Sequence, residues 1–379
     1  MQFESYPFEK LNTLLADVPA PKNRELISLT IGEPQFETPS FIQNALKESS
    51  ALLKKYPKTA GEDETIEAML SFNKRRFDLS LKKEELIPCF GTREVLFNFP
   101  QFLLFDIKEP VMAFTNPFYQ IYEGAAIASR AKILLLNLNE ENKFKPNMSI
   151  EQMKEADLVI LNFPNNPTAS VLSLVELGEW VKLALEYDFV LLNDECYSEI
   201  YVDTPPPSLL EAAKYVGNDS FKNTLVINSI SKRSSAPGLR SGFIAGDAQI
   251  LKKYMQYRTY VGCASPLPLQ AAASVAWKDE EHVAHSRKIY KKNFQIAQEI
   301  LGTAIPEASF YIWLKVGDEL AFTTKLFKEH HVKVLPGSYL GRENEKGENP
   351  GKGYVRIALV EDEEKTRTAL EAIKTCLNS

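Results

Sequence analysis

Short apolar runs alternate with longer segments of helical periodicity along most of this chain. The helical pattern covers residues 62–77, 93–105, 173–187, 266–277 and 280–301, and the strand-like runs are 111–114, 132–136, 158–162, 190–193, 224–228 and 243–245. Parallel strands need long crossover connections, which are usually helices, so this order predicts an α/β fold with a mainly parallel sheet. Ligands bind such sheets at the carboxyl ends of the strands, where we expect functional residues.

The length of the chain allows more than one domain. It has 379 residues, of which 44% are hydrophobic, and this is enough for two hydrophobic cores. The helical segment 280–301 is expected to connect a large part to a smaller C-terminal one. In the smaller part we expect strands within 309–315 and 353–359 and a helix near 319–330.

A lysine follows the apolar run 225–227 in a segment rich in hydroxyl groups. Lys232 lies close in sequence to Ser229, Ser231 and Arg240. A lysine amine attacks carbonyl carbons when burial or neighbouring charges lower its pKa. The serines and the arginine could hold a phosphate beside the same amine. A phosphate-bearing aldehyde bound to lysine indicates pyridoxal phosphate (PLP).

A carboxylate is needed beside the pyridine nitrogen of PLP, because a protonated ring accepts electrons from the substrate. Asp194 ends an apolar run that begins at Phe189, and Tyr197 follows three residues later. Taken alone, Asp194 is explained equally well as a helix cap or a loop acid. Beside Lys232, the cofactor interpretation is favoured, with the hydroxyl of Tyr197 near the phenolic oxygen of the ring.

Two further turns suit the same cofactor. The segment 162–169 contains Asn-Asn-Pro directly after a strand, where an amide can donate to the phenolate without adding charge. In the segment 88–94, Gly91 precedes a helix, so backbone N–H groups can face an anion with the help of the helix dipole. The glycine turn is a weak signal alone, because most such turns bind nothing.

In this order, these segments resemble the fold-type I PLP enzymes, specifically the class I/II aminotransferases, over nearly the whole chain. The matching motifs are Ile31-Gly32-Glu33-Pro34, Lys55-Tyr56-Pro57, Gly91-Thr92-Arg93, Asn116-Pro117-Phe118-Tyr119, Asn165-Asn166-Pro167-Thr168, Asp194 with Tyr197, Ser229 to Arg240, and Tyr354-Val355-Arg356. The resemblance implies a large PLP-binding domain, residues 46–284, with a mainly parallel seven-stranded sheet. Residues 1–45 and 285–379 would form a small α/β domain.

The resemblance also implies a role for each matching residue. Lys232 would form the Schiff base with PLP and later shuttle the proton, and Asp194 would pair with the pyridinium nitrogen. Asn166 and Tyr197 would bind the ring oxygen, while Tyr119 would stack on the ring.

The implied anion-binding residues form two groups. The phosphate would be held by Thr92, Arg93, Ser229 and Arg240, with Tyr56 reaching in from the second subunit of a homodimer. The substrate α-carboxylate would be bound by Arg356 as a bidentate fork, helped by Asn166 and the backbone of Gly32.

Two positions depart from the family pattern. Ala169 replaces the usual glycine after Asn-Pro-Thr, so this turn cannot need a conformation that only glycine reaches. The loop 233–237 after the lysine reads Arg-Ser-Ser-Ala-Pro, where many relatives carry an aromatic or small apolar pair. Neither change removes a catalytic group.

The expected reaction is amino-group transfer between an amino acid, with glutamate the commonest donor, and a 2-oxo acid. Similarity to aspartate-like aminotransferases includes the succinyl-diaminopimelate aminotransferases of lysine biosynthesis. Such a substrate needs a cation for its distal carboxylate, and Lys58, Arg93, Arg233 and Arg258 are candidates. The alternatives are a PLP-dependent carbon–sulfur β-lyase of the cystathionine type, an aspartate or aromatic aminotransferase, and a non-catalytic sensor.

Composition and charge limit which partners and which cellular compartment we expect for the protein. A net charge of −6 argues against a nucleic-acid partner. No apolar stretch reaches the roughly 20 residues that span a membrane, and residues 1–5 lack the pattern of a secretory signal. The four cysteines are scattered without a C-x-x-C pair, which favours reduced thiols in the cytoplasm, and Cys196 is interpreted as a packing residue.

The histidines give no sign of a metal site. They are His282, His285, His330 and His331, and none belongs to an H-E-x-x-H motif. We interpret His282 and His285 as exposed surface residues and expect no metal ion.

Overall fold

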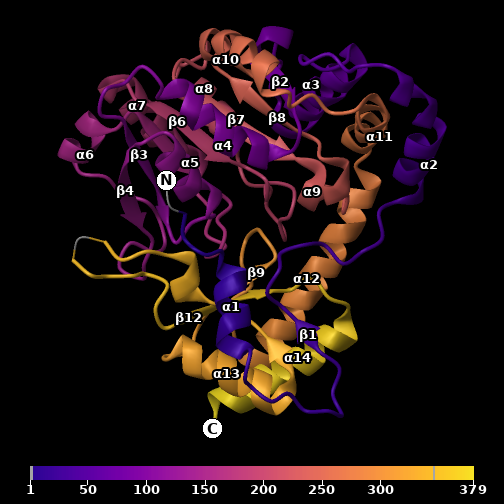
Figure 1. Ribbon diagram of the computed structural model, residues 1–379, viewed down its shortest axis with the longest axis vertical. Helices are drawn as coiled ribbons and strands as arrows, with labels where there is room; N and C mark the ends of the chain where they lie inside the picture. The colour runs from indigo at the N-terminus through magenta and orange to yellow at the C-terminus, as the bar shows by residue number, and fades with distance from the viewer. Residues whose placement is uncertain (1–2, 345) are drawn as a thin grey trace.

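The computed structural model describes residues 3–344 and 346–379, so Met1, Gln2 and Glu345 lie outside the described residues. A large sheet with its helices forms the upper half of the molecule in Figure 1, and two small sheets lie in the lower half beside the C-terminus. Helix α12 (Glu281–Leu301) runs from the upper half into the lower one (Figure 1). The predicted helix over residues 280–301 is confirmed.

The large sheet has seven strands in the order β2-β8-β7-β6-β5-β3-β4. β8 pairs antiparallel with both of its neighbours, and the other pairings are parallel. This confirms the predicted mainly parallel seven-stranded sheet. The strands are β2 (Leu86–Cys89), β3 (Val111–Asn116), β4 (Lys132–Asn137), β5 (Leu158–Leu161), β6 (Val190–Asp194), β7 (Thr224–Ser229) and β8 (Gly242–Gly246).

Helices cover both faces of this sheet because its strands are apolar on both sides. In β5, Val159 and Leu161 join one buried cluster, with helices α3, α7, α8 and α11, while Leu158 and Ile160 join the other, with α4, α5 and α10. Continuous apolar runs are typical of such doubly covered strands. The helices are α2 (Ser40–Glu48), α3 (Asp63–Phe77), α4 (Thr92–Leu103), α5 (Ile121–Ala128), α6 (Ile150–Glu155), α7 (Leu174–Tyr187), α8 (Leu209–Tyr215), α9 (Ile230–Arg233), α10 (Ala248–Val261) and α11 (Leu267–Lys278), with 3-10 turns η1 (Ser50–Lys54), η2 (Lys83–Glu85) and η3 (Pro237–Leu239).

The lower half joins the N-terminal segment to the C-terminal one. β1 (Ile27–Ser28) pairs with β10 (Val332–Lys333), and β12 (Tyr354–Ala358) lies between β11 (Leu335–Pro336) and β9 (Tyr311–Lys315). The helices here are α1 (Pro7–Leu15), α13 (Glu319–His330) and α14 (Glu363–Leu377), with the turn η4 (Gly337–Leu340). The domain boundaries at residues 46 and 284 stay a prediction; the first falls within α2, which packs on α11.

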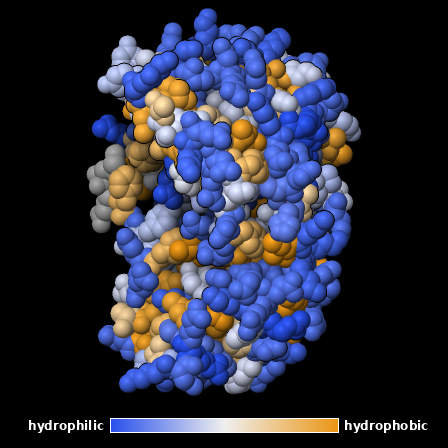
Figure 2. Space-filling view, turned by 90° about the vertical axis from the view of Figure 1, so that its right-hand side faces the viewer, coloured by the Kyte–Doolittle hydropathy of each residue, from blue (hydrophilic) through white to orange (hydrophobic). Residues whose placement is uncertain are grey.

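The surface on the side of α2 and α11 is mainly hydrophilic, with several apolar patches, one of them a row across the middle (Figure 2). Among the helices of the described residues, none is both long and apolar enough to cross a membrane.

His282, in the first turn of α12, is not the exposed residue that the sequence predicts. Its side chain is only 9% exposed. Nδ1 bonds to the carboxylate of Asp279, and Nε2 lies 2.8 Å from Oγ of Ser234. Ser234 follows Lys232 by two residues, so this histidine ties the start of α12 to the loop after the lysine. Burial holds the pKa of His282 below its ordinary value, although the bond to Asp279 acts in the opposite direction.

We therefore expect His282 to lower the free energy of unfolding as the pH falls. A histidine in the unfolded chain takes up a proton near pH 6.5, roughly, while the folded His282 stays neutral to a lower pH, so stability is lost as the pH falls below about 6.5. We expect His282→Gln to reduce the drop in the urea midpoint between about pH 7 and about pH 5. His285→Gln, at an exposed position of the same helix, is the control and should leave the drop unchanged. An unaltered drop in His282→Gln would contradict a buried neutral imidazole.

Candidate active site

A cavity of about 850 Å³ lies between the two halves. It receives loops that follow strands of the large sheet, the N-terminal segment, and side chains of β9 and β12. The residues predicted from the sequence that line it are Gly32, Thr92, Arg93, Tyr119, Asn166, Asp194, Tyr197, Ser229, Lys232, Arg240 and Arg356. Leu340, at the end of the turn η4, lines it as well.

Tyr56 is the predicted site residue that the fold leaves outside the cavity. It follows η1 and is 98% exposed. Its predicted contact with the phosphate requires a second subunit, so this role stays a prediction.

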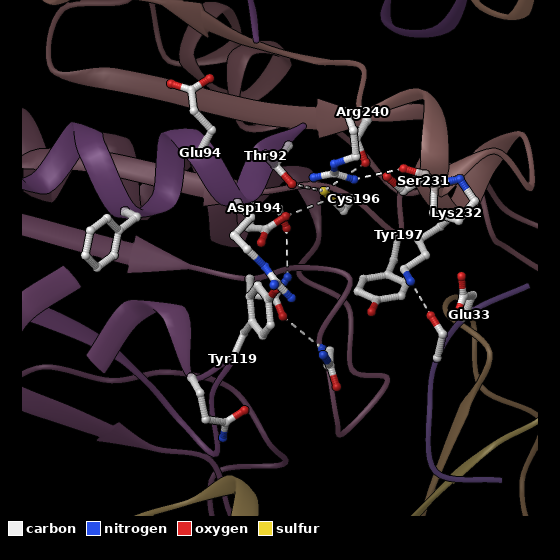
Figure 3. Close-up of a pocket in the computed structure, with 18 of the residues that line it drawn as sticks. Glu33, Thr92, Glu94, Tyr119, Asp194, Cys196, Tyr197, Ser231, Lys232 and Arg240 are labelled. Carbon is white, nitrogen blue, oxygen red and sulfur yellow. Dashed lines mark hydrogen bonds between the residues drawn. The ribbon is translucent and has the colours of Figure 1, made fainter. Parts of the chain in front are cut away.

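Lys232 lies in the short helix α9, directly after β7. Its Nζ donates a hydrogen bond to the carbonyl of Gly32, which Figure 3 marks with a dashed line. Burial is the main cause that lowers the pKa of Lys232 to about 8; the charges of Arg356 and Arg240 act in the same direction, and Cys196 and Glu33 oppose it. Near neutral pH the amine is still mostly protonated, but the neutral, nucleophilic fraction is far larger than in an ordinary lysine, whose pKa is 10.5.

An anion-binding corner forms where α4 begins. Gly91 has φ of 72°, and a Cβ atom there would lie 2.2 Å from Nη2 of Arg240. Glycine is therefore required for Arg240 to reach this helix start, where free backbone N–H groups and the helix dipole favour an anion. Thr92 and Ser231 lie beside Arg240 at this end of the cavity (Figure 3). This donor set fits a phosphate group.

Asp194 ends β6 and is 4% exposed. Its carboxylate accepts hydrogen bonds from the hydroxyl of Tyr122 at 2.9 Å and from the backbone N–H of Cys196 at 3.2 Å. Burial raises the pKa of Asp194, and these two donors oppose that shift. A buried carboxylate at a cavity wall suits a partner with an N–H donor, such as a protonated pyridine ring. Sequence reasoning missed Tyr122, whose only local signal is its place one helical turn after Tyr119.

Arg356 lies in β12 and is 4% exposed. Its Nη1 donates to the amide oxygen of Asn166 at 2.8 Å, and its Nη2 donates to the carbonyl of Thr30 at 2.6 Å. Its Nε is buried and has no hydrogen-bond partner within the described part of the chain. An unpaired buried guanidinium donor beside a cavity fits a carboxylate ligand.

Arg93 differs from the other arginines suggested for a distal carboxylate. Its Nε donates to the hydroxyl of Tyr119 at 2.9 Å, and the residue is exposed and lines the cavity. By contrast, Arg258 is buried against Glu94 at 3.0 Å, and Arg233 is buried with bonds to Glu280 and to the carbonyl of Ala276. Lys58 is not among the residues that line the cavity.

Three less expected features lie near the site. Cys196, interpreted as packing, lines the cavity, with its Sγ 3.3 Å from Oγ1 of Thr92 and 3.5 Å from Oγ of Ser229. Ala169 has φ of 59°, so its turn keeps the left-handed conformation that glycine reaches more easily, at a cost of about 1 kcal/mol. In the loop after the lysine, Ser235 also has a positive φ, of 47°.

Among the described residues, one group of side chains could hold a metal ion: Glu329, His330 and Cys376. None of the three lines the cavity. Nη1 of Arg24 lies 3.0 Å from Nδ1 of His330 and can only donate, so that nitrogen must accept. A histidine bound to a metal through its other nitrogen usually presents an N–H there instead. We therefore assign no metal ion to this group.

Comparison with known proteins identifies the class. Residues 24–373 match the family described as aminotransferase class I and II. The chain belongs to this family, and its members depend on PLP. The protein is therefore a PLP-dependent aminotransferase, as the sequence motifs implied.

Particular relatives cover the chain almost end to end. Aminotransferase AspB from Helicobacter pylori is 52% identical, with a TM-score of 0.96 over 99% of both chains. An aminotransferase from Neisseria meningitidis is 43% identical, with a TM-score of 0.94 over 99% of this chain and 98% of that one. LL-diaminopimelate aminotransferase from Maridesulfovibrio salexigens is 30% identical over 387 residues, which cover 97% of this chain and 95% of that protein.

The lowered pKa of Lys232 should set the pH dependence of PLP capture. Below about pH 8 the amine is mostly protonated, so we expect the rate at which apoprotein captures PLP to rise about tenfold per pH unit and then to level off. Stopped-flow absorbance would measure this rate. Lys232→Ala should retain no cofactor after borohydride reduction, which fixes PLP only on an amine. A rate still rising near pH 10.5, the ordinary lysine value, would contradict a desolvated amine.

Proposed function

We propose that this aminotransferase moves an amino group between glutamate and a 2-oxo acid that carries a second carboxylate on its side chain. The observation that carries the proposal is Arg93, a cation that lines the cavity in addition to Lys232, Arg240 and Arg356. When bound, PLP supplies an aldehyde that accepts the amino group and a ring that accepts electrons.

The residues around the ring divide the work between them. Lys232, with its lowered pKa, holds the cofactor and then takes and returns the α-proton at Nζ. Asp194 keeps a proton on the ring nitrogen, and the bond from Tyr122 fixes the orientation of its carboxylate. With PLP bound, Asn166 and Tyr197 would donate to the ring oxygen, and Tyr119 would cover one face of the ring.

Two of the arginines in the cavity then each bind one anionic group, either the phosphate of the cofactor or the α-carboxylate of the substrate. Arg240, with Thr92, Ser229 and Ser231, binds the phosphate at the start of α4. Arg356 binds the substrate α-carboxylate, because Asn166 and Thr30 already hold two of its nitrogens in place.

Arg93 is left for the side chain of the substrate. The resemblance assigned this arginine to the phosphate, but its bond to Tyr119 and its exposure favour a ligand group farther from the corner around Arg240. Relatives named LL-diaminopimelate aminotransferase support a long substrate with two acidic ends. Glutamate as donor, with succinyl-diaminopimelate or LL-diaminopimelate on the other side of the exchange, fits this requirement and a place in lysine biosynthesis.

We further propose a homodimer in the cytoplasm in which Tyr56 completes the partner's phosphate site. The proposal is supported by two neighbouring exposed side chains, since Tyr56 is 98% and Leu53 is 74% exposed. Large exposed apolar and aromatic groups close together favour a protein contact.

Absorbance of the bound cofactor tests the reaction. We expect L-glutamate alone to abolish the visible band and convert the cofactor to its amine form, and we expect an added 2-oxo acid to restore the band. Lys232→Ala should do neither. Pyruvate and ammonia released from cystathionine, without any response to glutamate, would favour the β-lyase instead.

The role of Arg93 can be separated from a phosphate role by comparing two donors. We expect Arg93→Gln to lower kcat/KM for glutamate by about 10- to 100-fold, because a bond to a charged group is lost. For an amino acid with a neutral side chain, kcat/KM should change little. Arg258→Gln is unsuitable as a control because it would break a buried pair, so Lys58→Gln, outside the cavity, serves instead. Equal losses for both donors, together with weaker retention of PLP, would support the phosphate role.

A further inference from the structure

Tyr311, which the sequence motifs do not mark, contacts both anion-facing and cofactor-facing residues of the cavity. It opens β9, is 2% exposed and lines the cavity. Its hydroxyl lies 3.0 Å from the hydroxyl of Tyr197. The guanidinium carbon of Arg356 lies 4.5 Å from the centre of its ring. One side chain of the lower half thus reaches a residue that follows β6 and a residue of β12.

The position of Tyr311 is tightly constrained. Its neighbour across the small sheet is Ala358, two residues from Arg356, so the two side chains share one face of adjacent strands. On the other side, a Cβ atom at Gly32 would lie 1.8 Å from the Tyr311 hydroxyl oxygen. The absence of a side chain at Gly32 is what lets the hydroxyl reach Tyr197, while the Gly32 carbonyl accepts from Lys232.

The two hydroxyls can be ordered only in certain ways. Each has one proton to donate. If Tyr197 donates into the cavity, the bond between the hydroxyls must be donated by Tyr311. A hydroxyl that accepts a hydrogen bond becomes a stronger donor itself, so Tyr311 would strengthen the bond that Tyr197 makes. The charged groups around Tyr197 are Arg356 and Asp194.

We propose that Tyr311 is a positioning residue with two separable parts. Its hydroxyl fixes the direction in which Tyr197 donates, and its ring holds the guanidinium of Arg356 at the angle that a carboxylate needs. This inference rests on the proposed function, because it requires a ring oxygen beside Tyr197 and a substrate carboxylate at Arg356.

Two substitutions separate the parts. Tyr311→Phe removes only the hydroxyl, and Tyr311→Leu removes the hydroxyl and the ring. Tyr290→Phe is a matched control, because Tyr290 is buried in the same cluster and its hydroxyl has no hydrogen-bond partner among the described residues. The measurements are the pH midpoint of the visible absorbance of bound PLP and the KM for glutamate.

In Tyr311→Phe, the weaker donation from Tyr197 should stabilise the ionised chromophore less, so the spectral midpoint should rise by about half a unit to one unit while KM stays within about twofold. In Tyr311→Leu, KM should also rise by about 3- to 30-fold, because the cation–π contact is lost. Tyr290→Phe should change neither quantity.

An unchanged spectral midpoint in Tyr311→Phe would overturn the hydroxyl part of the inference. An unchanged KM in folded Tyr311→Leu would overturn the ring part. If that variant does not fold, Tyr311→Phe tests the separation of the two parts: an increase in KM of roughly fivefold or more, as large as the loss of the ring contact should cause, would overturn it. A wild-type protein that binds no PLP, or that does not respond to glutamate, would overturn the proposed function itself.

Discussion

The burial of the Lys232 amine between the two halves of the molecule is the constraint on which the rest of the site depends. Its pKa falls to about 8 because the amine leaves water and because Arg240 and Arg356 share its cavity. Positive groups gather in one cavity only if other contacts hold them there, and Gly91 provides space for Arg240 while Asn166 and Thr30 hold Arg356. Such a cavity is stabilised by anionic ligands, which a phosphate and a carboxylate supply.

The division of labour between the halves follows from the same contacts. The groups that suit the cofactor lie at the ends of strands of the large sheet, since Asp194 ends β6 and Lys232 follows β7, whereas Arg356 and Tyr311 belong to the three-stranded small sheet. Gly32, in the N-terminal segment, contacts residues of both groups: its carbonyl accepts a hydrogen bond from Lys232, and its α-carbon, which carries no side chain, lies against Tyr311. Substrate binding therefore depends on how the halves meet, and a change in that contact should alter KM before it alters retention of the cofactor.

Local patterns were enough to predict the strands that carry the chemistry. Buried runs such as 158–162 and 190–193 end in polar residues, and this edge is where Asp194 and its neighbours lie. The prediction missed β2, which is short and contains Pro88, and it missed α10, whose tyrosines and lysines blur the apolar period. Tyr311 and His282 were missed or misjudged for another reason: their partners, Tyr197 and Ser234, are far away in sequence, so no local spacing marks them.

The arginines explain why sequence position alone could not choose among the candidate cations. Arg233 is adjacent to Lys232, yet successive residues of a helix point about 100° apart, so one side chain faces the cavity while the other packs near Phe72 and Trp277. Arg258 is committed to Glu94 in the interior. Arg93 reaches the cavity because it lies in the first turn of α4, whose start opens on the site. Substrate choice is thus expected to depend on that helix start, one residue away from Thr92 of the proposed phosphate corner. A longer or shorter side chain at position 93 would change specificity and would also alter the contact with Tyr119, while Lys232 and Asp194 keep their own contacts.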